Sequence, residues 1–297
     1  MIQHYYLGCP IWANKAWNGK FFTNKAKPKD YLRQYSKVFN TVEGNNTFYG
    51  LPKQDSLLNW KTTTPRHFRF SFKFPRQISH VFKLLDVQEE TLHFLKMMAH
   101  LEEKIGILFL QLPPSFNKYA LRRLDLFFQL LPQDFSYAVE VRNKDFFDNG
   151  EQENRFDDLL RKYGINRANF DTQTLHASTA TDDLTQMAQG KKPRMPQRFT
   201  TTAEMPLFRY AGEIAVNDNI AALRVIVPEV AQWIQAGKTP FVFMHSPGDV
   251  YAPHLAKQFH KMLQQHLLSL NSSINLGTLP SFPSDDENAL PQQMSLF

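Results

Sequence analysis

The sequence predicts an α/β fold of the (β/α)8 TIM-barrel type, regular or irregular, followed by a flexible C-terminal tail. Short β-branched and aromatic runs alternate with longer amphipathic segments along most of the chain, which is typical of parallel strands joined by helices. About eight such runs fit into about 270 residues, as a barrel requires. Most runs end in polar residues, which barrel enzymes gather at one mouth. We therefore expect a barrel domain over residues 1–270 and a tail over residues 271–297.

Composition and charge exclude several classes of protein. With 42% hydrophobic and 13% aromatic residues, the 297-residue chain can bury a full core. No apolar run approaches the roughly 18 residues that span a bilayer, and no secretory leader is visible, so we expect a cytoplasmic protein without a membrane partner. The single cysteine, Cys9, excludes an internal disulfide framework and a cysteine-based metal cluster. The net charge of +6 permits an anionic partner without requiring one.

The predicted strands are spaced so that a helix fits between most of them. They are Tyr5–Gly8, Phe39–Glu43, Phe68–Lys73, Ile107–Gln111, Tyr137–Val141, Asn166–Asp171, Leu207–Tyr210 and Phe241–His245. The segments predicted as helices are Lys29–Phe39, Lys53–Lys61, Glu89–Glu103, Tyr119–Leu131, Arg155–Tyr163, Ile220–Gln235 and His254–Leu268. An open doubly wound sheet is the alternative. No glycine-rich phosphate turn follows the first strand, which disfavours a dinucleotide-binding fold.

Seven of the eight predicted strands end in a polar or charged side chain. Because strand interiors here are apolar, these side chains would converge at the carboxyl ends of a barrel, where catalytic residues lie. The same acids and bases would alternatively pair in a structural network that closes the core, and we favour the functional pocket. The residues at the strand ends are Gly8, Glu43 with Asn45, Lys73, Gln111, Glu140 with Arg142, Asp171, Arg209 and His245.

Four separated motifs in this order resemble the YecE-like family, also described as domain of unknown function 72. They are the segments Thr41–Tyr49, Phe68–Pro75 with Ile78–His80 after it, Gln111–Phe116 and Ala138–Arg142. The resemblance covers roughly residues 4 to 260 of the chain. It implies a barrel distantly similar to apurinic endonucleases and sugar isomerases, and it implies no particular reaction.

Four strand-end residues are the candidates for catalysis. Glu43 or Glu140 would act as a general base, which requires a carboxylate of raised pKa. Asp171 would orient a group or share a proton, and Lys73 would hold an anionic oxygen or form a Schiff base. The two glutamates would alternatively form a glycosidase pair, and the separation of their carboxyl groups decides that mechanism.

A second group of residues is predicted to bind the substrate. Arginines would hold or support anionic oxygens, and neutral side chains would supply further hydrogen bonds. We expect no metal and no cofactor, because His245 is the one histidine at a strand end and the nearby cations would repel a dication. The predicted substrate-binding residues are Asn45, Tyr49, His80, Gln111, Arg142, Arg209 and His245.

The segment from Thr172 to Pro206 is long for a connection between strands, so it is either a lid or binding loop or a solvated, mobile segment. Its stretch Gly190–Arg198 carries four basic residues that would track a phosphate backbone, with His80 nearby. Trp12 and Trp17, after the first strand, would stack on a base or a sugar, or would cover the core.

The chain after residue 270 has the composition of a linker and ends in a short motif. Gln293, Met294, Leu296 and Phe297 resemble the bacterial motif that binds the DNA sliding clamp, although Leu296 and Phe297 would alternatively dock on the barrel itself. The sequence thus predicts a metal-independent enzyme that acts on a phosphate-bearing substrate, nucleic acid included, and that the clamp recruits. The alternatives are a non-catalytic protein that binds a small ligand or nucleic acid, and a glycosidase or sugar-phosphate isomerase.

Overall fold

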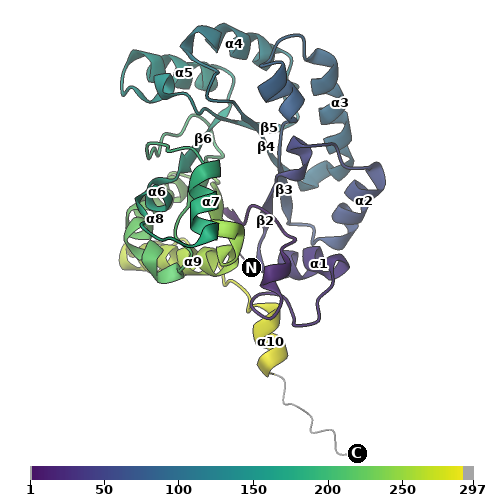
Figure 1. Ribbon diagram of the computed structural model, residues 1–297, viewed down its shortest axis with the longest axis vertical. Helices are drawn as coiled ribbons and strands as arrows, with labels where there is room; N and C mark the ends of the chain where they lie inside the picture. Colours follow the sequence, from purple (N-terminus) through teal and green to yellow (C-terminus); the bar gives the residue numbers. More distant parts are fainter. Residues whose placement is uncertain (1, 290–297) are drawn as a thin grey trace, which may run out of the picture.

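Eight parallel strands form a nearly closed barrel in the computed structural model, which describes residues 2–289 (Figure 1). The strand order is β1-β8-β7-β6-β5-β4-β3-β2, so neighbours in sequence are neighbours in space. The predicted barrel is confirmed, and each predicted strand lies within two residues of an observed one. The strands are β1 (Tyr6–Gly8), β2 (Thr41–Gly44), β3 (Arg69–Lys73), β4 (Ile105–Gln111), β5 (Ser136–Glu140), β6 (Asn166–Asp171), β7 (Leu207–Ala211) and β8 (Phe241–His245).

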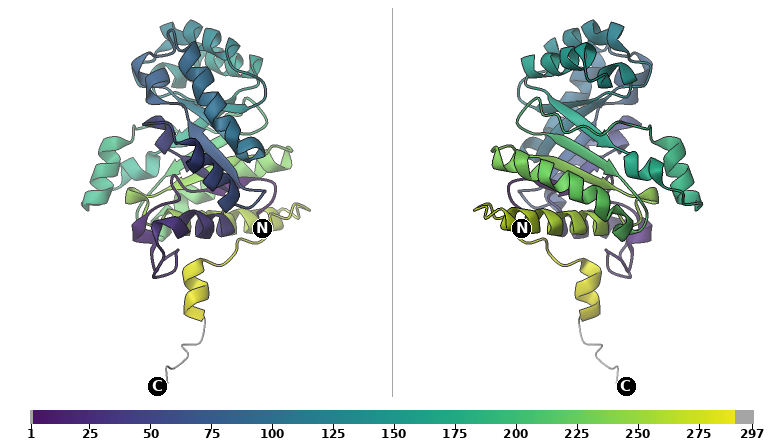
Figure 2. Two further views of the ribbon diagram at one scale, coloured as in Figure 1. Left: turned by 90° about the vertical axis from the view of Figure 1, so that its right-hand side faces the viewer. Right: turned by 90° about the vertical axis from the view of Figure 1, so that its left-hand side faces the viewer.

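Helices cover the outside of the barrel (Figures 1 and 2). The described helices are α1 (Pro28–Val38), α2 (Gln54–Thr63), α3 (Gln88–Met98), α4 (Leu121–Gln129), α5 (Glu151–Lys162), α6 (Gln173–Ala177), α7 (Asp183–Lys191), α8 (Ile220–Gln235), α9 (Ala252–Ser269) and α10 (Pro283–Ala289). Within residues 2–289, none of them combines the length and the apolar character needed to cross a bilayer. The sequence did not predict α6, α7 and α10.

Alternation along the strands separates two cores. One set of side chains, including Phe109, Ala138 and Phe243, fills the inside of the barrel. The residues between them in the sequence, such as Leu108 and Val139, point outward and pack under the helices. Side chains alternate along a strand with a period of two. Whether a residue faces the barrel axis therefore depends on its parity, that is, on its odd or even position along the strand.

Between β1 and β2 no regular backbone ladder forms: the Glu43 N–H donates one hydrogen bond to the Cys9 carbonyl (3.0 Å), and side chains supply further links. Asn40 accepts a hydrogen bond from the Leu7 N–H (2.8 Å) and donates one to the Tyr5 carbonyl (2.9 Å). The Tyr35 hydroxyl accepts from the Cys9 N–H (2.7 Å) and donates to the carbonyl of the first residue of β2 (2.9 Å). These two side chains satisfy buried backbone groups that a strand pair would otherwise satisfy.

The segment after α9, predicted to be flexible, packs on the barrel as far as the structure describes it. Leu276 and Phe282 are both 1% exposed. The carbonyl of Leu276 accepts a hydrogen bond from the Gln3 N–H (2.8 Å), and the ring of Phe282 packs edge-on against Phe21. Leu276 lies seven residues after the end of α9, and Phe282 directly precedes α10. No helical or strand spacing therefore marks these two apolar anchors within the linker-like composition. The motif at Gln293–Phe297 lies outside the described residues.

Candidate functional site

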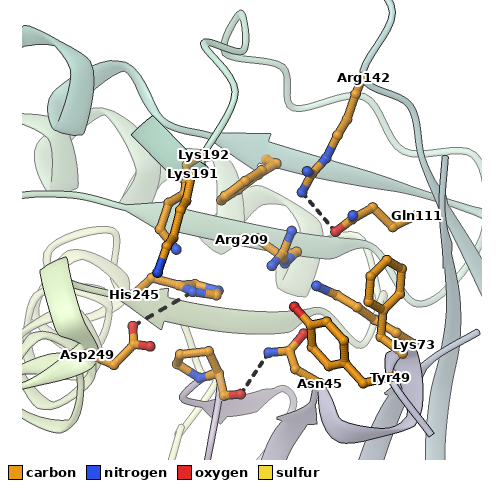
Figure 3. Close-up of a pocket in the computed structure, with 13 residues that line it drawn as sticks. Asn45, Tyr49, Lys73, Gln111, Arg142, Lys191, Lys192, Arg209, His245 and Asp249 are labelled. Atoms are coloured by element: carbon orange, nitrogen blue, oxygen red, sulfur yellow. Dashed lines mark hydrogen bonds and ion pairs between the residues drawn. The ribbon is translucent and has the colours of Figure 1, made fainter. Parts of the chain in front are cut away.

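A cavity of about 310 Å³ opens at the carboxyl ends of the strands (Figure 3). Cationic side chains dominate its polar lining, and aromatic rings line part of its wall. It lies where barrel enzymes bind their substrates. Its lining residues are Pro10, Asn45, Phe48, Tyr49, Lys73, Gln111, Arg142, Phe170, Lys191, Lys192, Arg209, His245 and Asp249.

Strand parity explains which predicted residues reach this mouth. Glu43, Lys73, Gln111, Glu140, Arg209 and His245 share the parity of the residues that fill the barrel interior. In β6 the inward residue is Phe170, which lines the cavity. Asp171 has the opposite parity and does not line it. Its carboxylate instead accepts hydrogen bonds from the Gln197 side chain (2.6 Å) and the Gln173 N–H (2.9 Å), which hold the base of the 172–206 insertion.

A buried ionic network lies beneath the cavity. Arg209 donates two hydrogen bonds to Glu43 (2.7 and 2.8 Å) and a third to Glu140. Arg142 in turn donates to Glu140 (2.8 Å) and to Gln111 (2.8 Å). Both glutamates are at most 1% exposed and neither lines the 310 Å³ cavity. The structural network and the pocket, which the sequence offers as alternatives, therefore coexist as two layers.

This network changes the expected roles of the two glutamates. Burial raises the pKa of Glu140, but the guanidinium groups of Arg209 and Arg142 lower it further, to about 2. Burial also acts against the charge of Glu43, yet Arg209, His245 and Lys73 hold its pKa well below the usual value. A general base needs a raised pKa, and a glycosidase acid must be protonated. The lowered pKa values of Glu43 and Glu140 instead favour the ionised form of both carboxylates beside their cationic neighbours.

Lys73 lines the cavity, and its amine makes no hydrogen bond to the described residues. Its side chain is 11% exposed, and its Nζ lies 3.7 Å from Glu43, beyond hydrogen-bond distance. The amine faces the rings of Phe109 (5.3 Å) and Phe48 (5.9 Å). Burial, and then the charge of Arg209, lower the pKa of Lys73 to about 7. This amine is therefore available in both protonation states near neutral pH.

Asp249 lies on the opposite wall from Lys73, and the sequence did not identify it (Figure 3). Burial raises the pKa of Asp249 to about 6, against the opposing charge of Lys192. Its Oδ1 is buried, makes no hydrogen bond to the described protein atoms and lies 3.9 Å from the Nδ1 of His245. Burial lowers the pKa of His245 to about 3, so this imidazole is neutral.

The backbone at Asp249 is strained. Its φ of 53° lies in the left-handed region, which non-glycine residues rarely adopt. The Trp17 indole N–H donates to the Asp249 carbonyl (2.7 Å), and the Asn14 side chain donates to the carbonyl of Gly248 (3.2 Å). Such strain persists where surrounding contacts hold it and is concentrated at functional sites. Trp17 is fully buried, so of its two predicted roles the structure assigns it to the core.

The insertion after β6 brings two further cations to the cavity. Lys191 ends α7 and Lys192 follows it, and both side chains line the cavity. Burial lowers the pKa of Lys192, against the charge of Asp249. Arg198, from the same basic stretch, instead pairs with Glu153 (2.8 Å). The first two lysines of this stretch therefore line the cavity, although neither was among the predicted site residues. That the four basic residues track a phosphate backbone stays a prediction.

Of the predicted binding residues Asn45, Tyr49 and His80, the first two line the cavity and His80 does not. Asn45 donates to the Pro10 carbonyl (2.9 Å), and Tyr49 lines the cavity with 84% of its surface exposed. His80 does not line the cavity, and its ring packs edge-on against Phe48. Burial, and then the charge of Arg142, lower the pKa of His80 to about 4, so it is neutral near the mouth. Among residues 2–289, no group of three or more His, Cys, Asp or Glu side chains is placed to hold a metal ion.

Comparison with known proteins shows clear relatives. The family described as "Protein of unknown function DUF72" matches residues 6–276. The chain is 36% identical to the UPF0759 protein YecE of Escherichia coli K12 over 98% of this chain and 99% of that protein. A crystal structure of a DUF72 family protein from Thermotoga maritima has a TM-score of 0.67, with 24% identity over 87% of this chain and 98% of that one. One from Enterococcus faecalis has a TM-score of 0.65, with 18% identity over 93% and 99%.

Proposed function

This chain belongs to the DUF72 family, and from that premise we propose that its barrel binds a small phosphate-bearing substrate in the cavity and acts on it by proton transfer. The observation that carries the proposal is the excess of available cations. Five cationic side chains line the cavity, against Asp249 in the lining and Glu43 and Glu140 beneath it. Within the described residues, the amines of Lys73, Lys191 and Lys192 make no hydrogen bond, so an anion can accept from all three.

The two cavity walls supply the proton-transfer groups. Asp249 on one wall has a pKa of about 6, and Lys73 on the other has a pKa of about 7. General acids and bases are most effective when their pKa lies near the working pH. A substrate held by Lys192 and Arg142 would thus lie between a proton acceptor and a proton donor. The guanidinium of Arg209, fixed by its carboxylates, would stabilise negative charge that develops in the reaction.

A second candidate function follows from the Lys73 amine. A sugar phosphate with a carbonyl group would be attacked by the neutral amine, forming a C–N bond. After proton transfer the carbonyl oxygen leaves as water, and an imine remains. Borohydride would reduce this imine to a stable secondary amine. Incubation with dihydroxyacetone phosphate and borohydride would then add mass at Lys73, and labelling that persists in Lys73→Met would contradict this assignment.

The first test of the proposal is anion binding, measured by calorimetry with sulfate. We expect Lys192→Gln to weaken sulfate binding by roughly fivefold, because one charge contact in a wet pocket contributes about 1 kcal/mol. Lys96→Gln, on the exposed face of α3, is the matched control and should leave binding unchanged. Absence of sulfate binding to the wild-type protein would overturn the proposal.

Turnover separates the enzyme from the non-catalytic alternative. A panel of phosphodiesters and sugar phosphates should contain a substrate whose conversion Asp249→Asn and Lys73→Met both reduce by about 100-fold or more, the usual contribution of a general acid or base. If these variants convert that substrate at the wild-type rate, the catalytic assignment is wrong. Sulfate binding without turnover of any compound in the panel would favour the binding protein.

The proposal has a second, separate part that concerns recruitment. The C-terminal residues Gln293, Met294, Leu296 and Phe297 resemble the sliding-clamp motif, and we propose that they bind the clamp in the cytoplasm. One observation supports it: α10, which precedes them, lies at the outer edge of the molecule, away from the cavity-lining α7 (Figures 1 and 2). A clamp-bound protein would meet nucleic acid, which belongs to the proposed class of phosphate-bearing substrates.

A further inference from the structure

A second, smaller cavity of about 180 Å³ adjoins the cationic one. The two share Pro10 and Asn45, so a ligand that fills one lies next to the other. The second cavity is lined by the end of β2 and by the loops after β1 and β2, and Glu43 is the one charged residue in its described lining. Its lining residues are Pro10, Ile11, Trp12, Ala13, Glu43, Gly44, Asn45 and Asn46.

Trp12 is the aromatic ring of this second cavity. Its indole packs edge-on against Trp60 (5.0 Å between ring centres) and Phe70 (6.1 Å), which hold the ring from the side of the barrel. The residue is only half-buried, whereas Trp17, five positions later, is fully buried. A fixed indole with open surface beside a cationic pocket is the arrangement that proteins use to stack planar rings of phosphate-bearing ligands.

Asn45 stands at the junction of the two cavities. Its side-chain amide donates a hydrogen bond to the Pro10 carbonyl (2.9 Å). Its Oδ1 is buried and has no hydrogen-bond partner in residues 2–289. A buried acceptor without a partner is unfavourable, and a ligand N–H or O–H at this point would satisfy it. The junction therefore favours a polar ring over a purely apolar one.

We infer that the second cavity is a subsite for a planar heterocyclic ring, and that the substrate class is a nucleoside monophosphate. This inference rests on the proposed function, because the phosphate group would occupy the cationic cavity beside it. Lys192, Lys191 and Arg142 would bind the phosphate, Trp12 would stack on the base, and Asn45 would accept a hydrogen bond from the sugar or the base. Stacking on one aromatic side chain raises affinity by roughly tenfold.

The experiment measures calorimetric affinities of four probes: adenosine monophosphate, ribose 5-phosphate, inorganic phosphate and adenosine. We expect adenosine monophosphate to bind roughly tenfold more tightly than ribose 5-phosphate. Trp12→Ala should remove this difference and leave inorganic phosphate binding unchanged. Trp12→Phe, which keeps a ring, should preserve most of the difference and also guards against misfolding of the alanine variant. Tyr119→Ala, which removes an aromatic ring that is 83% exposed and far along the chain from the loops that line the second cavity, is the matched control.

The outcomes distinguish this inference from the proposed function. If adenosine monophosphate and ribose 5-phosphate bind equally well to the wild-type protein, the ring subsite is overturned while phosphate binding stands. A difference that persists in Trp12→Ala would likewise overturn the role of this indole. Adenosine binding that depends on Trp12, without any phosphate binding, would support the subsite and overturn the proposed function. Failure of all four probes to bind would overturn both.

Discussion

Arg209 is the residue on which the ionic arrangement of the mouth depends. It is 3% exposed and donates hydrogen bonds to Glu43 and Glu140 at once, which favours the ionised form of both carboxylates. The ionised state of Glu43 and Glu140 follows from these contacts.

The strand-end positions were predictable, because parity and polarity can be read from single strands. The pairing was not, since β2, β5 and β7 meet only in the closed barrel. Asp249 escaped prediction because it lies in a strained turn four residues beyond β8.

Glu140→Gln tests this network at the residue scale. The carboxylate of Glu140 has a pKa of about 2 in the folded protein and about 4.3 when unfolded, so it stabilises the fold above pH 4.3 and loses that effect as the pH falls towards 2. Since removal of one partner from a buried ion pair is strongly destabilising, we expect a loss of about 3–5 kcal/mol at pH 7. The loss should be smaller at pH 3.

Urea unfolding at the two pH values measures this difference. Glu151→Gln is the control, because this glutamate on α5 is 76% exposed and, among the described residues, pairs only with Arg155 across 3.8 Å. It should show no measurable change at either pH. Equal stability losses for Glu140→Gln at pH 7 and pH 3 would show that its carboxylate is not held ionised by Arg209.

The pH dependence of sulfate binding tests Asp249 and Lys73 together. Sulfate remains a dianion throughout, so only the protein titrates. As the pH rises from 5 to 8, Asp249 gains negative charge near pH 6 and Lys73 loses positive charge near pH 7. Affinity should therefore fall in two steps, each of roughly fivefold. Asp249→Asn should remove the first step and Lys73→Met the second. An affinity that is flat from pH 5 to 8 in the wild-type protein would contradict both assignments.

At the scale of elements, the barrel closes without a regular backbone ladder between β1 and β2. We call this junction the β1–β2 seam. Gly8 permits the close approach, because a Cβ atom there would lie 2.2 Å from the carbonyl oxygen of Thr41. Asn40 and the α1 residue Tyr35 then satisfy the backbone groups on both sides. This makes Tyr35 part of the barrel wall as well as of the helix layer.

Tyr35→Phe should therefore destabilise the protein more than an ordinary tyrosine substitution. It leaves the Cys9 N–H and the Thr41 carbonyl without their side-chain partner, and each buried unsatisfied group costs about 1–3 kcal/mol. Denaturant unfolding measures the effect. Tyr31→Phe is the matched control, since Tyr31 is also buried on α1 and its hydroxyl makes no hydrogen bond to the described residues. Similar losses in both variants would show that the seam does not depend on the Tyr35 hydroxyl.

The helix α7 shows where element prediction failed. Its nine residues bury only Thr185 and Ala188, so no apolar stripe marks it as a helix. Its start is stabilised by the Asp182 side chain, which accepts from the Thr185 N–H (2.9 Å). Most of the predicted helices bury larger apolar residues with helical spacing, as α8 does with Leu223, Ile226 and Val230. A short helix that packs through small residues leaves too weak a pattern to be recognised.

At the scale of the whole molecule, the segment after α9 runs along the outside of the barrel. It contacts both the first and the last βα unit. Phe282 packs against Phe21, from the loop after β1, and against His254 at the start of α9. The Phe21 carbonyl accepts a hydrogen bond from the Ser284 N–H (3.1 Å). The segment thus ties the first and last βα units together beside the seam between β1 and β2.

Phe282→Ala should reveal how much this segment stabilises the barrel. Phe282 is 1% exposed, and truncation of a buried phenylalanine to alanine destabilises by about 3–5 kcal/mol. Urea unfolding followed by circular dichroism measures the loss. Leu270→Ala is the control, because Leu270 is 51% exposed directly after α9. If Phe282→Ala unfolds like the wild-type protein, the segment lies on the barrel without stabilising it.

Because α10 is attached through Phe282, a truncation that removes only residues 290–297 separates recruitment from folding and from ligand binding. The full chain should bind a bacterial sliding clamp with a dissociation constant on the order of micromolar, since two apolar side chains in a groove gain only a few kcal/mol after ordering. The truncated chain should lose clamp binding, and its sulfate affinity and unfolding free energy should match those of the full chain. Leu296→Ala with Phe297→Ala should reproduce the loss without shortening the chain. Clamp binding measured by surface plasmon resonance that survives both changes would place the contact elsewhere, whereas reduced stability on truncation would indicate that Leu296 and Phe297 dock on the barrel itself.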